Sequence, residues 1–130
     1  MDNLQKSEAV IARILAHVAE NGLQPSELTN DTLELDAEMA PFFVACYDWL
    51  EAEGIVRSTN ISRTLNGHIY VTNPAITAYG FRLLGQGVSL GGENTTLGAA
   101  VKEVSTGRSF SQIGELIGGI LGAFTKSISS

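Results

Sequence analysis

The sequence predicts an α+β fold, with two helices, a β-hairpin and a short helix in residues 1–85 and a helical segment at 96–130. Two observations lead to this prediction. Apolar residues recur at helical spacing up to Gly54, and apolar and polar residues then alternate beyond it. Of the 130 residues, 44% are hydrophobic and 17% charged, which suits a globular domain with a buried core.

The first helix is expected from Lys6 to Asn21, with Ser7 as its N-cap and Gly22 as the left-handed residue that ends it. Its apolar residues at helical spacing are Val10, Ile11, Ile14, Leu15 and Val18. We interpret His17 as a partly exposed helix residue. A metal-ligand role is disfavoured because the other histidine, His68, has no acidic or cysteine company at ligand spacing.

The second helix is expected from Asp36 to Glu53, after a loop or irregular turn at 23–35. Asp36 or a nearby residue caps it, and Pro41 is tolerated only near its first turn. Its broad apolar face contains Phe42, Phe43, Ala45, Cys46, Trp49 and Leu50. We expect Trp49 to be buried between this helix and the hairpin, and Cys46, the single cysteine, to be a buried and inert thiol.

A β-hairpin is expected after Gly54. The stretches "IVRSTNIS" and "HIYVTN" alternate in polarity, and Asn66-Gly67 between them is a strong turn signal. A slightly longer loop with the same pairing is the alternative. The stretch "ITAYGFRLL" then offers a short helix. Helix, helix, hairpin and closing helix is the order of a winged-helix domain.

Three stretches carry a family resemblance: "ILAHVAENG", "FVACYDWLEAEGIV" and "HIYVTNPAITAYGFRLL". They resemble segments of the small YjcQ-like winged-helix proteins of bacteria and prophages. In that family a helix ends in L-x-x-E-G-hydrophobic and the wing is followed by T-x-x-G-x-x-h-L, a pattern met by Thr77, Gly80, Leu83 and Leu84. The resemblance covers Glu8 to Leu84 and implies a winged-helix fold, but little about activity. The compact "TNDTLELD" connection departs from ordinary transcription factors, which place a full helix there.

Charge is distributed unevenly between the two parts of the chain, whose net charge is −6. Eleven acidic and two basic residues precede Gly54, whereas three acidic and six basic residues follow it. The helix that would enter a DNA groove, from Asp36 to Glu53, has no basic residue, so repulsion by phosphate disfavours DNA binding. Arg57, Arg63 and His68, on the expected wing, are the candidate nucleic-acid contacts.

No enzymatic activity, cofactor or metal is expected. The sequence contains no phosphate-binding loop, no paired Cys or His at metal spacing and no recognisable catalytic set. We interpret the glycines of "LLGQGVSLGGEN" as a linker at 86–95, because no buried strand or basic residue completes a phosphate site. The N-terminus lacks the features of a secretory signal, which makes the cytosol the expected compartment.

The C-terminal segment 96–130 is expected to form a helical hairpin or tail. Thr95 or Thr96 caps a short helix, and a second helix begins near Ser109 to Ser111. In "SQIGELIGGILGAF" glycine recurs every four residues, although each costs a helix about 0.5 to 1 kcal/mol against alanine. Close backbone packing against a partner offsets that cost. The expected oligomer interface comprises Ile113, Gly114, Ile117, Gly118, Leu121, Gly122 and Phe124.

Three partners compete for this glycine row: the core of the same chain, a second copy and a membrane. A membrane fits poorly, because the apolar run would span only about 18 Å of a ~30 Å hydrocarbon layer. The sequence therefore favours a non-enzymatic interaction or adaptor protein that forms a homo-oligomer, with a dimer preferred and any other protein partner unidentified. The alternatives are a DNA-binding transcriptional regulator and a membrane-associated phage factor.

Overall fold

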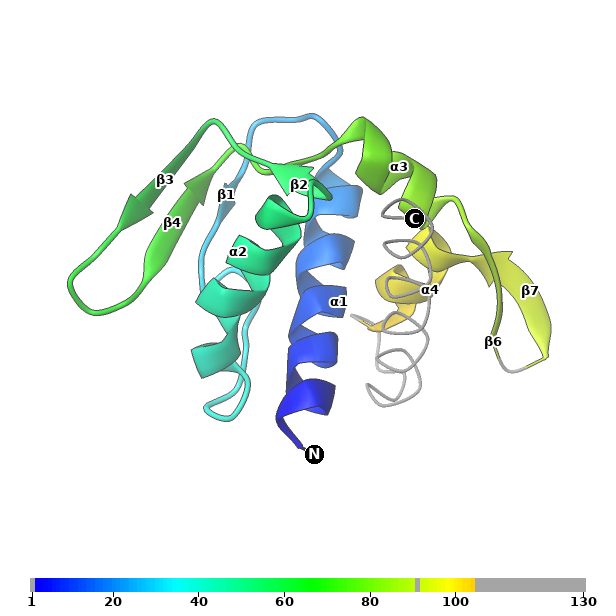
Figure 1. Cartoon of the computed structure of the whole chain (residues 1–130), viewed down its shortest axis with the longest axis horizontal. Helices are drawn as coiled ribbons and strands as arrows, with labels where there is room; N and C mark the ends of the chain where they lie inside the picture. The colour runs from blue at the N-terminus through cyan, green and yellow to red at the C-terminus, as the bar shows by residue number, and fades with distance from the viewer. Residues whose placement is uncertain (1, 91, 105–130) are drawn as a thin grey trace.

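The chain combines helices with small antiparallel sheets, so the α+β prediction is confirmed (Figure 1). The structure is a computed structural model that describes residues 2–90 and 92–104. The elements run, in chain order, α1 (Asn3–Asn21), β1 (Glu27–Leu28), the 3-10 helix η1 (Ala40–Phe42), α2 (Phe43–Ala52), β2 (Val56–Arg57), β3 (Asn60–Arg63), β4 (Ile69–Thr72), β5 (Ala75–Ile76), α3 (Ala78–Leu84), β6 (Gly87–Leu90), β7 (Glu93–Thr96) and α4 (Leu97–Val104). The predicted second C-terminal helix and its oligomer interface lie outside the described residues.

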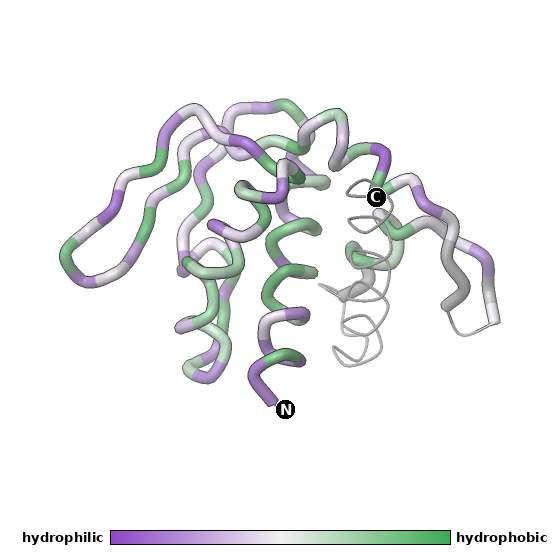
Figure 2. The backbone as a smooth tube through the Cα atoms, in the orientation of Figure 1, coloured by the Kyte–Doolittle hydropathy of each residue, from purple (hydrophilic) through white to green (hydrophobic). Residues whose placement is uncertain are grey.

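Helix α1 runs through the centre of the fold, with α2 on one side and α4 on the other (Figure 1). From Ala9 to Val18 every residue except Arg13 and His17 is buried, and this part of the helix is largely hydrophobic (Figure 2). A helix that is apolar almost all round belongs in a core. The positive φ of Gly22, +61°, ends the helix as predicted.

The N-cap of α1 is Asp2, so the prediction of Ser7 is wrong. The Asp2 carboxylate accepts a hydrogen bond of 2.8 Å from the Gln5 N–H, and the Gln5 side chain accepts one of 3.0 Å from the Asp2 N–H. This reciprocal capping box satisfies two N–H groups that the helix itself leaves unpaired. Ser7 lies inside the helix and donates to the Asn3 carbonyl instead.

The helix expected from Asp36 to Glu53 is interrupted. Asp36 accepts hydrogen bonds from the N–H groups of Glu38 and Met39, at 3.0 and 2.8 Å, and Pro41 lies in the following 3-10 turn η1. The α-helical part, α2, buries its residues at i, i+3, i+4 and i+7, which are Phe43, Cys46, Tyr47 and Leu50.

The predicted burial of Trp49 is wrong, because its side chain is 38% exposed. Trp49 falls outside the i, i+3, i+4, i+7 set that α2 turns toward the core, and Tyr47, fully buried, takes the central place. Cys46 is buried, as predicted.

Strands β3 and β4 form the predicted hairpin. Ile61 pairs with Val71, and Arg63 with Ile69. The connection spans residues 64–68 and is closed by a 3.0 Å hydrogen bond from the Thr64 N–H to the His68 carbonyl, so the longer-loop alternative is the one observed. A third strand, β1, pairs with β4 on its other side, in a stretch whose sequence predicts only a loop or irregular turn.

Thr77 and Gly80 fix the start of α3 against Ile55, in the segment between α2 and β2. The Thr77 hydroxyl accepts a hydrogen bond of 3.0 Å from the Gly80 N–H, and the Thr77 N–H donates to the Ile55 carbonyl. A Cβ at Gly80 would collide with the Ile55 carbonyl oxygen and lie 2.7 Å from Cγ2 of Ile76. These contacts give a physical reason for the T-x-x-G part of the sequence pattern.

The expected linker at 86–95 is wrong, because strands β6 and β7 form an antiparallel hairpin there, with Gly87 opposite Thr96. Gly92, with φ +84°, lies in its turn. Thr96 caps α4 as predicted, its hydroxyl accepting from the Ala99 N–H at 3.2 Å. Because Leu97, Ala100 and Val101 are buried in the same core as α1, α4 packs with the preceding elements.

Candidate functional site

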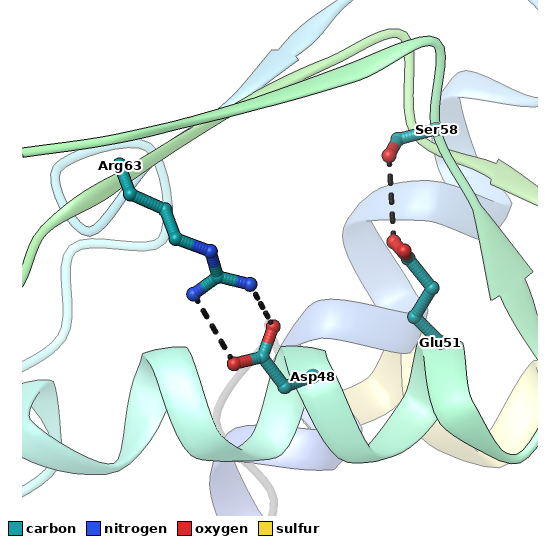
Figure 3. A network of polar contacts seen from close by, with 4 residues as sticks. All are labelled: Asp48, Glu51, Ser58 and Arg63. Carbon is teal, nitrogen blue, oxygen red and sulfur yellow. Dashed lines mark hydrogen bonds and ion pairs between the residues drawn. The ribbon is translucent and has the colours of Figure 1, made fainter.

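A network of polar side-chain contacts lies where α2 meets the β3–β4 hairpin. We call it the α2–hairpin face and define it by Asp48, Glu51, Ser58 and Arg63 (Figure 3). Asp48 and Glu51 belong to α2, Ser58 follows β2, and Arg63 ends β3. Because Arg63 lies opposite Ile69 in the register, whose side chain is buried, its side chain leaves the hairpin on the side of the core and reaches α2.

Arg63 and Asp48 form a two-pronged ion pair across this face. The Arg63 Nη2 lies 2.8 Å from Asp48 Oδ1, and Nη1 lies 3.3 Å from Oδ2 (Figure 3). The hydrogen bonds and the charge of Asp48 raise the pKa of Arg63 above its ordinary value. Side-chain exposures of 55% for Arg63 and 42% for Asp48 show that water reaches both groups. An exposed ion pair of this kind adds little to the stability of the fold, and its main effect is to hold the Arg63 guanidinium against α2.

A second polar contact lies beside the first. The Ser58 hydroxyl donates to Glu51 Oε2 at 3.4 Å (Figure 3). Beneath it, the buried Tyr47 hydroxyl has no partner in good hydrogen-bonding geometry, although Ser58 and Glu51 lie close enough to affect its pKa. Burial raises the pKa of Tyr47 to about 12; Glu51 and Asp48 act in the same direction, and Ser58 acts against them. Tyr47 is therefore a neutral phenol near pH 7 and is unsuited to act as a base.

The three candidate nucleic-acid contacts are not brought together. Arg63 is paired with Asp48, and His68 lies exposed in the hairpin loop. Arg57 lines a separate hollow of about 420 Å³, formed by Leu23, Pro25, Arg57, Ser58, Thr59, Asn73 and Ala75. No side-chain hydrogen bond or ion pair of Arg57 occurs within residues 2–90 and 92–104.

Asn73 shapes the rim of this hollow. It has a left-handed backbone, φ +51°, which asparagine tolerates better than most residues. Its side-chain oxygen accepts from the Ser26 N–H at 3.1 Å, and its own N–H donates to the Ser26 carbonyl at 2.8 Å. These two bonds fasten the connection after α1 to the turn between β4 and β5. The hollow thus has a fixed rim and one cationic side chain.

Burial shifts the pKa values of Cys46 and His17, and it leaves the Cys46 thiol protonated and unreactive near pH 7. Cys46 is buried, its thiol donates to the Ser7 carbonyl at 3.6 Å, and burial raises its pKa to about 11. Burial also lowers the pKa of His17, against the opposing charge of Glu20. Within the described ranges there is no group of three potential metal ligands, and no helix of that part of the chain has the length and apolar character to cross a membrane.

Sequence reasoning missed Asp48 as the partner of Arg63. The excess of acidic residues before Gly54 and of basic residues after it was the available signal, because opposite charges on packed elements tend to pair. A second feature, an apolar hollow between α1, α3 and α4, had no sequence signal, because it arises from the mutual placement of three helices.

Comparison with known proteins adds no assignment. No protein-family model, curated protein or solved structure matches the chain. The likeness to YjcQ-like winged-helix proteins therefore stays a hypothesis that rests on the motifs quoted above.

Proposed function

We propose that the chain is a non-enzymatic winged-helix interaction module that self-associates through its C-terminal glycine row. In this proposal α1 and α2 are the two helices of the motif, the β3–β4 hairpin is the wing and α3 is the closing helix. Their order along the chain and the packing of Thr77 and Gly80 against Ile55 support this reading.

The observation that carries the proposal is the ion pair between Arg63 and Asp48. A winged-helix protein that reads DNA places its second helix in the major groove and uses free basic groups on phosphate. On this chain α2 presents Asp48 and Glu51, and the nearest arginine already points at Asp48. A duplex would approach two carboxylates and compete for that arginine. These charges suit a protein partner better than a phosphate backbone.

Self-association is assigned to the glycine row on sequence grounds, because Ile113 to Phe124 lies outside the described residues. Gly114, Gly118 and Gly122 occupy neighbouring positions of the predicted helix and permit close backbone approach by a second chain. A close contact of this kind offsets the loss of helix propensity at the three positions.

Sedimentation of the full chain tests this proposal. We expect the wild type to sediment as a dimer or larger at ~100 μM, and Gly118→Leu to sediment smaller with an unchanged circular dichroism spectrum. Gly87→Leu is the matched control, since an added Cβ at Gly87 meets nothing within 4 Å. A wild type that stays monomeric at this concentration removes self-association from the proposal.

A DNA-binding regulator is the second candidate, favoured by one observation. Arg57 is unpaired within the described chain and shares its hollow with Thr59, whose hydroxyl is a group that binds phosphate oxygens. Fluorescence anisotropy against random-sequence duplexes separates the two candidates. The interaction module predicts weak, salt-sensitive and unselective binding. Nanomolar selection of one sequence, lost in Arg57→Ala, would establish the regulator instead.

A further inference from the structure

An apolar hollow of about 370 Å³ opens between the end of α1, the helix α3 and the start of α4. Its lining consists of Val18, Ala19, Gly22, Ile76, Phe81, Leu84, Thr96, Gly98 and Ala99. Val18 and Ile76 are buried, whereas Phe81 is 54% exposed. A large aromatic side chain exposed beside an apolar hollow leaves apolar surface in contact with water, and covering that surface is favourable.

Small residues keep the hollow open while the helices around it stay close. Gly98 lets α4 approach α3, because a Cβ there would lie 3.3 Å from the Leu84 carbonyl oxygen. Ala19, Gly22 and Ala99 also contribute little side-chain volume to the lining. The result is a shallow apolar surface with fixed walls, suited to side chains supplied by another segment.

We propose that this hollow receives the chain's own C-terminal segment through a stripe of Leu116, Ile120 and Ala123. These positions follow the i, i+4, i+7 spacing that shares one side of a helix. At 3.6 residues per turn, Leu116 and Ile120 lie about 160° around the helix from Gly118. The stripe can therefore contact the hollow while the glycine row faces a second chain. This contact rests on the proposed function, because both require the stretch from Ile113 to Phe124 to form a helix.

The length of chain beyond α4 favours an occupant from the same molecule. The eight residues of α4 extend about 12 Å, and the hollow lies beside its first turn. Residues 105–110, which precede the predicted helix, span up to about 20 Å when extended, which is enough to return to that turn. A short tether holds the segment at an effective concentration of about millimolar. A separate molecule at micromolar concentration competes poorly with it.

The size of the hollow points to the same occupant. Nine residues line it, whereas a stable interface between separate proteins uses about 20 to 30 residues on each side. The contact is therefore too small to hold a second copy by itself, and it suits a tethered segment that pays no separate cost of association.

Disulfide trapping in the full chain tests the contact. We introduce Ala99→Cys together with Ile120→Cys and oxidise mildly, leaving the buried, protonated Cys46 in place. The expected product is a monomer with an internal disulfide, two hydrogens lighter by intact mass. The control pairs Ile120→Cys with Leu65→Cys, at a fully exposed hairpin residue, and should give at least about 5-fold less of that product. A covalent dimer, or no excess over the control, overturns the inference.

A charge placed in the hollow gives an independent readout. Ala99 is exposed and lies in the first turn of α4, where a carboxylate is favourable to the helix, so Ala99→Glu should leave the fold intact. Displacing the segment should speed tryptic cleavage after Arg108 by about 5-fold or more, since proteolysis follows the open population. Leu65→Glu is the control. Equal cleavage rates in the two variants contradict the proposed contact.

The two experiments separate this inference from self-association. A monomeric wild type that forms the internal disulfide would remove the glycine-row dimer and keep the docked segment. A wild type that self-associates without forming the internal disulfide would keep the dimer and remove the docked segment.

Discussion

The α2–hairpin face and the apolar hollow between α1, α3 and α4 differ in how far their groups have partners within the chain. Helix α2 and the β3–β4 hairpin lie on one side of α1, and α4, which lines the hollow, lies on the other (Figure 1). On the α2–hairpin face, Arg63 forms an ion pair with Asp48, and Ser58 donates a hydrogen bond to Glu51. At the hollow, Phe81 stays half exposed above buried Val18 and Ile76. The polar side chains of the α2–hairpin face therefore already have partners within the chain, whereas the hollow retains apolar surface whose burial is favourable.

The largest expected effect concerns the residue beneath the polar face. Tyr47→Ala should lower the free energy of unfolding by about 3 to 5 kcal/mol, because it empties a fully buried aromatic site. Trp49→Ala, on the exposed flank of the same helix, should cost about 1 kcal/mol or less. Urea denaturation of both variants measures the difference. A greater loss of stability for Trp49→Ala than for Tyr47→Ala would show that α2 turns the face with Trp49, not the face with Tyr47, toward the core.

Tyr47→Phe refines this prediction. It removes a buried hydroxyl that makes no hydrogen bond, so stability should be unchanged or slightly raised. A loss above about 1 kcal/mol would mean that the hydroxyl does have a partner.

The next largest loss of stability is expected in α3, one of the helices around the apolar hollow. Gly80→Ala should cost about 1 to 3 kcal/mol, because the added Cβ meets the Ile55 carbonyl oxygen, a backbone atom that cannot move aside as a flexible side chain would. Gly87→Ala adds the same methyl group in open space and is the control. Thermal or urea unfolding measures both. Equal stabilities would show that α3 shifts freely against Ile55.

The helices, the β3–β4 hairpin and the Gly22 terminus could be predicted because each depends on local spacing and turn chemistry. Trp49 was misplaced because amphipathic patterning gives a face only to within about a residue, and the competing Tyr47 also carries a large ring. The strand β1 has two residues and is defined by pairing with β4, far along the chain. Such pairings leave little local pattern to read.

The site was less predictable than the fold for the same reason. Arg57, Arg63 and His68 were grouped because all three lie on the expected wing, and the structure gives each a different environment: a hollow, an ion pair and an exposed loop. The β6–β7 hairpin was missed because the glycines at 85, 87, 91 and 92 outweighed the alternation between them. A Gly-Gly pair between two short alternating stretches was a hairpin signal given too little weight.

A smaller effect tests how completely Asp48 neutralises the polar face. Asp48→Asn removes one carboxylate and releases Arg63, so weak binding to a random duplex should strengthen at low salt. The slope of log affinity against log salt should steepen by about one charge. Anisotropy titrations at several salt concentrations measure the slope, and Glu38→Gln, which removes an exposed carboxylate that precedes α2, is the control. Identical slopes for the wild type and both variants would show that Asp48 does not restrain Arg63 from phosphate.

The smallest expected effect is a pH dependence at the end of α1, beside the apolar hollow. Burial lowers the pKa of His17 below its ordinary value of 6.5, so the unfolded chain binds a proton more readily than the folded chain. This contribution to stability is therefore complete above pH 6.5 and is lost as the pH falls toward the lowered pKa. Urea midpoints between pH 7.5 and 5.5 should fall more for the wild type than for His17→Gln, which keeps a polar side chain without the titration. Titration of carboxylates in that range affects the wild type and His17→Gln equally. If the urea midpoints of the two proteins change in parallel with pH, the charge of Glu20 cancels the effect of burial on the pKa of His17.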